Sequence, residues 1–270
     1  MVEIEPVGTE RAGPARWSVM PTFTGPEWLL LGLAAFAVGA AKSGMPALGP
    51  IPAAIFASVL PAKASTGAVL GLLLVGDLIA VRMHHAHADW KVLRRLLPSV
   101  LVGILLGVVV LWAANDVTVR RIIGATLLVL VALSVVLMLR RRADAAAGLE
   151  ARPVPPALSL VFGPLGGFTT MIANAAGPVM TLYFVASRLP VRAILGTAAW
   201  FFLIVNTMKL PFSIGLGLMT PESLLLDLLL VPALVLGAFG GRMAAGRISQ
   251  AWFERVVLLL TFASGVYLLV

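Results

Sequence analysis

The sequence predicts an all-α polytopic membrane protein with two inverted-topology repeats, each a broken hairpin followed by three transmembrane helices. The chain is 60% hydrophobic and 12% charged, whereas about 25% of residues are charged in a soluble domain. Apolar runs such as 122–139 and 256–270 are nearly uninterrupted, and about 20 apolar residues cross a bilayer as a helix. The third observation is an internal repeat.

The internal repeat relates the two halves of the chain. The segment 61–67 returns 129 residues later as 190–196, and Gly49-Pro50 returns as Gly177-Pro178. Three more residues return in the same order, with Pro98, Gly103 and Gly107 matched by Pro232, Gly237 and Gly241. Each half also opens with an apolar segment broken by glycine and proline. Such paired broken segments point to the binding site of a secondary transporter, because unwound backbone at membrane depth requires surrounding protein or water.

The chain divides into four parts. Residues 1–25 are polar and lack a basic start followed by an apolar run, so we expect a disordered tail and not a cleaved signal peptide. Residues 26–139 form the first membrane repeat and residues 157–270 the second. Residues 140–156 form a linker between them, which carries several arginines.

Residues that interrupt apolar helices, mainly glycine, proline and charged residues, divide each repeat into five apolar segments, which we call pieces. These are 28–41, 45–60, 64–82, 96–114 and 119–139, then 157–172, 175–187, 193–208, 224–241 and 252–270. The first two pieces of each repeat are short for spanning a bilayer at a rise of about 1.5 Å per residue. We interpret each short pair as a re-entrant hairpin or as two short spans. In either case the two ends of a repeat lie on opposite sides, so the second repeat is inverted.

Basic residues predict the orientation. The positive-inside rule favours a cytoplasmic linker at 140–156. The outer loops then hold Lys63, Arg120, Arg121 and Lys209, beside Arg11 and Arg16 on the tail, whereas thirteen lysines and arginines lie inside and Lys42 lies at the break in the first repeat. We therefore predict that both termini lie outside. The net charge of +8 is explained by these cytoplasmic loops, so we do not expect nucleic-acid binding.

Two small-residue motifs indicate close helix packing. Gly103 and Gly107 form one Gly-x-x-x-Gly motif, and Gly237 and Gly241 form the other. Such motifs let helix backbones approach closely in lipid. We expect packing within the chain, and a homodimer interface is left open.

A lysine lies at the break in the first repeat, in the sequence Lys42-Ser43-Gly44-Met45-Pro46. An ammonium at membrane depth costs about 2.5–3.5 kcal/mol on insertion scales, which makes it a functional-site hypothesis. Free N–H groups beside Gly44 and a helix N-terminus after Pro46 would attract an anion. We expect Lys42, Ser43 and Gly44 to bind substrate, and Lys42→Ala to abolish anion binding in a folded protein. The alternatives are that Lys42 reaches the membrane surface or pairs with Asp77.

The break in the second repeat carries hydroxyls and an amide but no charge. Thr169, Thr170 and Asn174 could donate hydrogen bonds to a sulfonate or carboxylate. They could equally cap the broken helix ends or bridge helices.

Asp77 and Asn206 are equivalent positions, 129 residues apart. Asp77 is our candidate for a coupling proton, or it accepts a hydrogen bond from a neighbouring helix. We place Asn206 and Thr197 behind the residues of the two breaks, as further substrate-binding candidates. Lys209 is expected near the outer end of its helix, where it reaches the membrane surface or forms an outer gate for anions.

Other chemistry finds little support in the sequence. His84, His85 and His87 form a cluster that could bind a metal, although loop clusters of this kind are mostly solvated, and we assign no metal ligands. The chain has no cysteine and its three histidines all lie in that loop, so the predicted spans contain neither a thiol nucleophile nor a histidine base. We expect no enzyme activity and no cofactor.

Four stretches carry a resemblance to a known family: Ala41–Gly49, Asn174–Pro178, Gly196–Phe202 and Asn206–Pro211. At these residues the chain resembles the TauE/SafE family of sulfite and organosulfonate exporters, over about 28–270. Many members have a glycine-rich run where this chain has Lys42-Ser43-Gly44, so it resembles a lysine-bearing branch. The resemblance implies movement of a small anion across a bacterial inner membrane.

The function we predict is secondary transport, most simply export, of a small anion such as sulfite or an organosulfonate by alternating access. One alternative is a passive anion channel, which would use the same residues without a coupled cycle. A second alternative is a metal-ion carrier that uses the histidine cluster. The expected partners are the anionic substrate and the lipid bilayer.

Overall fold

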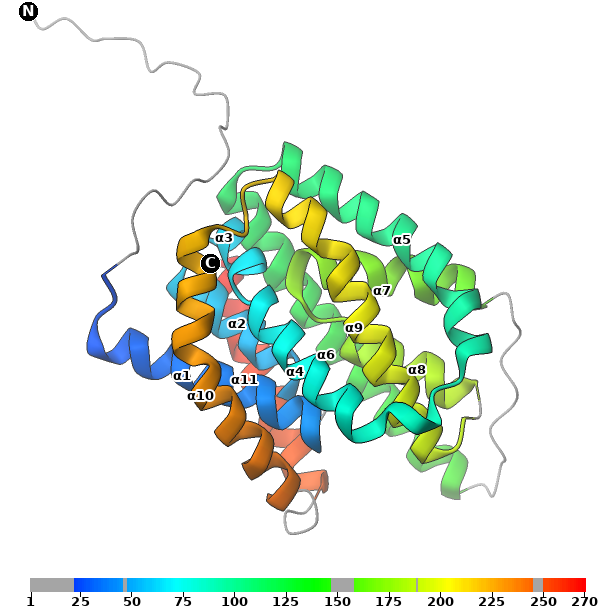
Figure 1. The fold of residues 1–270 in the computed structure, drawn as a ribbon. Coiled ribbons are helices and arrows are strands. Elements are labelled where there is room, and N and C mark those ends of the chain that lie inside the picture. Colours follow the sequence, from blue (N-terminus) through cyan, green and yellow to red (C-terminus); the bar gives the residue numbers. More distant parts are fainter. Residues whose placement is uncertain (1–21, 46–47, 147–157, 188, 245–249) are drawn as a thin grey trace, which may run out of the picture.

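The computed structural model describes residues 22–45, 48–146, 158–187, 189–244 and 250–270, and their regular structure is entirely helical (Figure 1). The helices before the linker are α1 Gly25–Ser43, α2 Pro50–Val59, α3 Ala62–Ala68, α4 Leu70–His84, α5 Trp90–Ala113 and α6 Asp116–Ala146, with the 3-10 turn η2 at His85–His87. Those after it are α7 Ser159–Ala173, α8 Gly177–Ala186, α9 Val191–Gly215, α10 Pro221–Ala244 and α11 Gln250–Leu269. The predicted linker falls on α6 up to residue 146 and then lies outside the described residues, as does most of the predicted tail.

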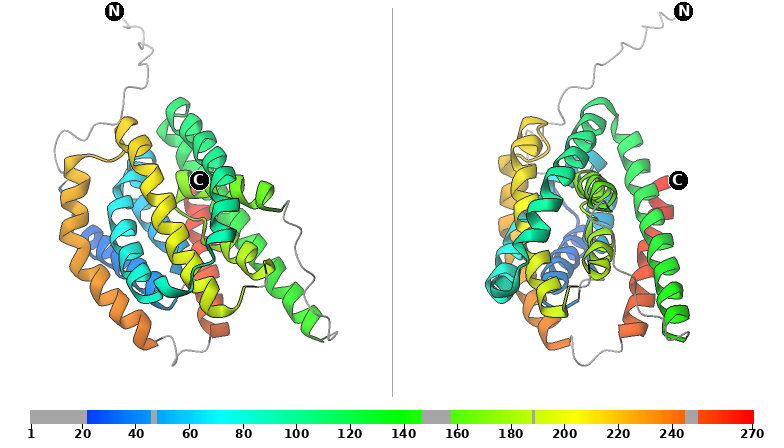
Figure 2. Two further views of the ribbon diagram at one scale, coloured as in Figure 1. Left: turned by 45° about the vertical axis from the view of Figure 1, so that its right-hand side comes forward. Right: turned by 90° about the vertical axis from the view of Figure 1, so that its right-hand side faces the viewer.

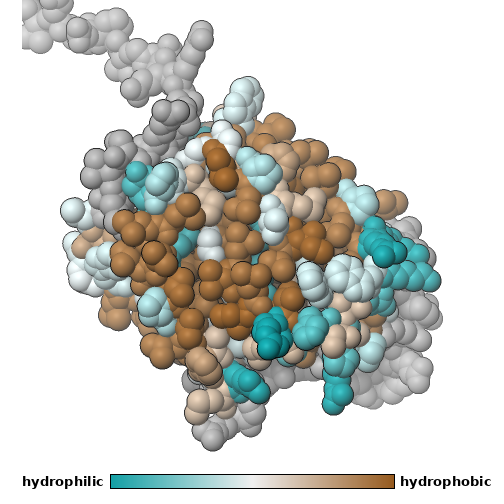
Figure 3. All heavy atoms as spheres, viewed as in Figure 1, coloured by the Kyte–Doolittle hydropathy of each residue, from teal (hydrophilic) through white to brown (hydrophobic). Residues whose placement is uncertain are grey.

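Five described segments are long and apolar enough to cross a membrane: Ala62–His87, Trp90–Ala113, Asp116–Val136, Arg192–Gly215 and Pro221–Met243. Three shorter apolar helices, Pro50–Val59, Ser159–Ala173 and Arg255–Leu269, accompany them. Apolar side chains cover most of the face drawn in Figure 3, and hydrophilic ones gather toward its lower and right-hand edges. A wide apolar surface of this kind suits contact with lipid.

The helices form layers (Figure 2). In the right-hand view α6 and α11 lie together on one side, and α9 and α10 lie on the other. The helices α1, α2, α7 and α8 lie between these groups. The most extensive packing joins α5 with α7 and α1 with α10, followed by α6 with α11 and α4 with α9. Helices from the two halves of the chain are therefore interleaved.

The two Gly-x-x-x-Gly motifs pack within the chain. A Cβ on Gly103 would collide with the backbone of Pro164 in α7, and one on Gly237 would collide with the backbone of Phe36 in α1. Gly107 and Gly241 likewise face α7 and α1. The expected intramolecular role is confirmed for these glycines, and no dimer contact is needed to explain them.

Three predicted segments differ from the helices of the structure in detail. In the piece 45–60 the described helix α2 begins at Pro50, since proline is favoured at the first helical position. The piece 64–82 lies within the single candidate span Ala62–His87, which a turn at Val69 divides into α3 and α4. Its glycines allow Leu218 and Asp227 to approach on either side of the turn. The piece 193–208 continues as a helix to Gly215. Pro211 lies inside α9, and proline is tolerated within membrane helices.

Candidate functional site

The predicted breaks in the two short hairpins are confirmed. In the first, α1 ends at Ser43 and α2 begins at Pro50. In the second, α7 ends at Ala173 and α8 begins at Gly177. Asn174 closes α7 in the left-handed conformation, with φ 51°, which asparagine tolerates better than most residues. The backbone N–H groups of Asn174 and Ala175 donate to the carbonyls of Thr170 and Thr169, at 3.1 and 3.3 Å.

At the first break Lys42 forms a buried ion pair. Its Nζ lies 2.6 Å from Oδ1 of Asp77 on α4, and the two side chains are 15% and 0% exposed. The ammonium also lies 4.2 Å from the centroid of the Phe202 ring on α9, a distance typical of a cation–π contact. The alternative in which Lys42 pairs with Asp77 is therefore the one that the structure shows.

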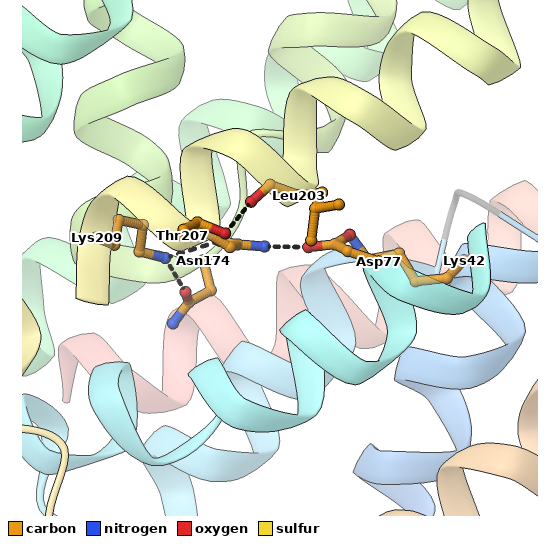
Figure 4. Close-up of polar contacts among 7 residues, drawn as sticks. Lys42, Asp77, Asn174, Leu203, Thr207 and Lys209 are labelled. Carbon is orange, nitrogen blue, oxygen red and sulfur yellow. Dashed lines mark hydrogen bonds and ion pairs between the residues drawn. The ribbon is translucent and has the colours of Figure 1, made fainter. Parts of the chain in front are cut away.

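From Asp77 a chain of polar contacts continues to the second break (Figure 4). Nδ2 of Asn206 donates to Oδ2 of Asp77 at 2.6 Å. Nζ of Lys209 donates to Oδ1 of Asn206 at 3.3 Å and to Oδ1 of Asn174 at 2.5 Å. Asn174 in turn donates through Nδ2 to the carbonyl of Thr66 on α3, at 2.9 Å. We call Lys42, Asp77, Asn174, Asn206 and Lys209 the buried polar network.

The buried polar network carries more positive than negative groups. It has two ammonium groups and a single carboxylate, and Asp77 pairs with Lys42. Lys209 is fully buried and, among the described residues, forms no ion pair; its Nζ donates hydrogen bonds to two neutral amide oxygens. Burying a cation without an anion is costly, so this side chain is suited to binding an anion.

The expectation that Lys209 reaches the membrane surface was wrong. Proline at 211 suggested a helix end, but α9 runs on to Gly215 and keeps Lys209 inside the protein. A signal was present in the sequence: Lys209 lies three residues after Asn206, and residues at this spacing share a helix face.

Ser43 and Gly44 lie beside the network, and their polar groups are already used. The Ser43 hydroxyl donates to the carbonyl of Gly39 at 2.9 Å. The backbone N–H groups of Gly44 and Met45 both donate to the carbonyl of Ala40, at 3.1 and 3.0 Å. The expectation of free N–H groups beside Gly44 was therefore wrong, because these two groups complete the last turn of α1.

The side chains of the three predicted threonines are used in local packing or hydrogen bonds. Thr169 donates to the carbonyls of Leu165 and Gly166 in its own helix, at 2.8 and 3.2 Å. Thr170 is buried in the last turn of α7. Oγ1 of Thr197 accepts a hydrogen bond from the backbone N–H of Asp89, at 2.9 Å. Thr197 precedes Asn206 by nine residues on α9, about 13.5 Å along the helix, so it stabilises the turn before α5 and lies apart from the network.

The histidine cluster lies at the end of α4 and in η2. Within the described part of the chain, no group of three or more His, Asp or Glu side chains is placed to hold a metal ion. Gly196 of α9 packs against the backbone of His84 and His87, which gives this turn a packing role.

Long apolar helices, two broken hairpins and a buried charged network between them define a multi-pass membrane protein of the transporter class. Comparison with family models gives the particular family: residues 28–268 match the model described as Sulfite exporter TauE/SafE. The chain belongs to the TauE/SafE sulfite exporter family, whose members are membrane transporters and not enzymes. No curated protein and no solved structure matches the chain.

Proposed function

We propose that this protein is an inner-membrane secondary transporter that exports a small anion, such as sulfite or an organosulfonate, by alternating access. Family membership supports transport of an anion. The observation that carries the proposal is Lys209, a fully buried lysine whose Nζ donates hydrogen bonds to the neutral oxygens of Asn174 and Asn206. An anion at this position would neutralise the charge that the network leaves uncompensated.

The anion would bind between the two breaks. Lys209 would provide the main charge, and Asn174 and Asn206 would turn amide groups toward the anion oxygens. Lys42 would contribute a second positive charge, which the ion pair with Asp77 neutralises in the present arrangement. Ser43, Gly44, Thr169 and Thr170 would line the edges of this site, and they would contact the anion only after rearrangement of the breaks, since most of their polar groups are used locally.

We propose further that the two halves are inverted repeats. Packing supports this, because α1 contacts α10 as α7 contacts α5. The close glycine contacts recur as well: Gly39 meets the carbonyl of Leu234, and Gly167 meets that of Val100. If α1 corresponds to α7 and α5 to α10, these are equivalent contacts. Alternating access would then exchange the conformations of the two halves around the buried polar network.

Counterflow in proteoliposomes tests the proposed function. Vesicles loaded with unlabelled sulfite should take up labelled sulfite faster than empty ones, and the rate should saturate with concentration. Flux without saturation or stimulation from the opposite side would indicate the channel alternative. Replacement of His84, His85 and His87 by Ala should leave sulfite counterflow unchanged, and a loss of metal accumulation in that variant would favour the metal carrier.

A further inference from the structure

A second buried carboxylate lies outside the buried polar network. Asp227 on α10 is 4% exposed, and neither Oδ1 nor Oδ2 has a hydrogen-bond partner of good geometry among the described residues. Oδ1 of Asp77 likewise lacks a hydrogen bond of good geometry, but Asp77 differs because Oδ1 forms an ion pair with Lys42 and Oδ2 accepts a hydrogen bond from Asn206, each at 2.6 Å. A buried carboxylate without such partners carries the full cost of losing water when it is ionised.

Asp227 lies against the turn between α3 and α4. A Cβ on Gly71, in the first turn of α4, would collide with Oδ2 of Asp227. The backbone N–H groups that the carboxylate faces are those of Gly71 and Leu72. First-turn N–H groups have no partner within their own helix, and they favour a negative charge. This contact joins α10 of the second half to α4 of the first.

Among the described residues, no oppositely charged group forms an ion pair with Asp227. The ionisable groups on the helices packed against α10 are Glu27 and Lys42 on α1, Lys63 on α3, and Asp77, Arg82 and His84 on α4. None of them forms an ion pair with Asp227 in the described parts of the chain. The protonated and the ionised form of the Asp227 carboxyl are therefore each favoured by a different effect. Protonation removes the cost of a buried charge, whereas close approach of the α4 N-terminus stabilises the ionised form.

We propose that Asp227 binds the proton that is coupled to anion transport, an inference that rests on the proposed function. Movement of one half against the other changes the distance between Asp227 and the start of α4. The carboxylate oxygen takes up a proton from the side to which the site is open, and it releases the proton on the other side when the α4 N–H groups approach. Asp77 was the sequence-based candidate, but its pairing with Lys42 gives it a role in balancing charge in the network.

Infrared difference spectroscopy tests whether Asp227 binds an exchangeable proton. Purified wild-type protein should show a carbonyl band of a protonated carboxylic acid that disappears reversibly as the pH is raised. The band should be absent from Asp227→Asn and present in Asp77→Asn. Asparagine also caps helices well, so a merely structural role of Asp227 is preserved in the first variant. A band that is missing in wild type, or that is lost in Asp77→Asn instead, overturns the assignment.

Transport tests the coupling itself. Proteoliposomes are given a pH difference with the membrane potential clamped at zero, and methanesulfonate is used because it stays ionised near neutral pH. One coupled proton per anion drives about tenfold accumulation per pH unit. Asp227→Asn should lose this accumulation and keep methanesulfonate counterflow, whereas Asp227→Glu should retain both.

The outcomes separate the two proposals. Accumulation that persists in Asp227→Asn, or that follows a sodium gradient instead of the pH difference, overturns proton binding by Asp227 as the coupling step. Loss of counterflow together with accumulation in Asp227→Asn also overturns it, since the residue would then support the anion site or the fold. If wild-type protein carries neither methanesulfonate nor sulfite, the proposed function fails and the coupling role fails with it, while the infrared band still decides whether Asp227 binds a proton.

Discussion

Asn206 donates a hydrogen bond to Asp77 over 2.6 Å, and the two residues lie 129 positions apart in the chain. The same spacing separates the repeated segments 61–67 and 190–196. Two positions at this spacing thus meet inside the protein, on α4 and α9. One of them carries a charge and the other is neutral, so the site is asymmetric even where the sequence repeats.

Removal of Lys42 should destabilise the fold. Lys42→Ala leaves Asp77 buried without its cation, and breaking a buried ion pair in this way costs about 3–5 kcal/mol. The sequence led us to expect a folded Lys42→Ala variant, and the ion pair adds the prediction that this variant is less stable than wild type. Thermal unfolding in detergent measures the effect, and the double variant Lys42→Met with Asp77→Asn should recover much of the loss. Additive losses in the double variant would argue against the pair.

Larger side chains at the packing glycines should be harmful in both halves alike. Gly103→Leu and Gly237→Leu each force a side chain into a neighbouring backbone, and overpacking costs about 1–3 kcal/mol or more. Gly32→Leu on α1 is the matched control, because its Cβ meets nothing within 4 Å. Thermal stability and the detergent-solubilised yield report the difference. Equal stability of all three variants would contradict the helix packing described.

Asn174 should combine a backbone role with a binding role. Asn174→Gly keeps the left-handed backbone at φ 51° but removes the contacts to Lys209 and Thr66. Asn174→Ala adds a conformational cost of about 1–2 kcal/mol. We expect both variants to weaken sulfite binding and Asn174→Ala alone to lose the additional stability. Comparison of binding isotherms with unfolding curves separates the two effects, and unchanged binding in Asn174→Gly would exclude a binding role.

Thr197 should matter for stability and not for the anion. Thr197→Val keeps the shape of the side chain and removes the acceptor of the Asp89 N–H group, a loss of about 0.5–1.5 kcal/mol. Sulfite affinity should equal that of wild type. A weaker affinity in this variant would return Thr197 to the site, as the sequence suggested.

The predicted orientation of the chain in the membrane can be tested by cysteine labelling, since the natural chain has no cysteine. Single cysteines at Asn115 and Met219 should react with a membrane-impermeant thiol reagent added to intact cells. A single cysteine at Ala86 should react only after the membrane is opened. Labelling of Asn115→Cys and Met219→Cys from opposite sides would contradict inversion of the second repeat.

Much of the fold could be predicted because hydropathy and the residues that interrupt apolar helices act locally. Gly49-Pro50 and Gly177-Pro178 interrupt the apolar runs, and the structure has helix starts there. The turn at Val69 carries no such local signal, and the residues that pack beside it, Leu218 and Asp227, are distant in sequence. The same limit applies to the site. Lys42, Asp77, Asn174 and Asn206 were singled out as polar groups at membrane depth, whereas the burial of Lys209 depends on how far α9 continues.

The most direct test of an anion site at Lys209 is calorimetric titration of the purified protein with sulfite and methanesulfonate. Lys209→Gln removes the charge and keeps a hydrogen-bonding side chain of similar length. A charge-assisted hydrogen bond contributes about 1.5–3 kcal/mol, so we expect affinity to fall about 10- to 100-fold. Lys91→Gln, at an exposed position, should bind as wild type does. Wild-type affinity in Lys209→Gln would contradict the proposed site.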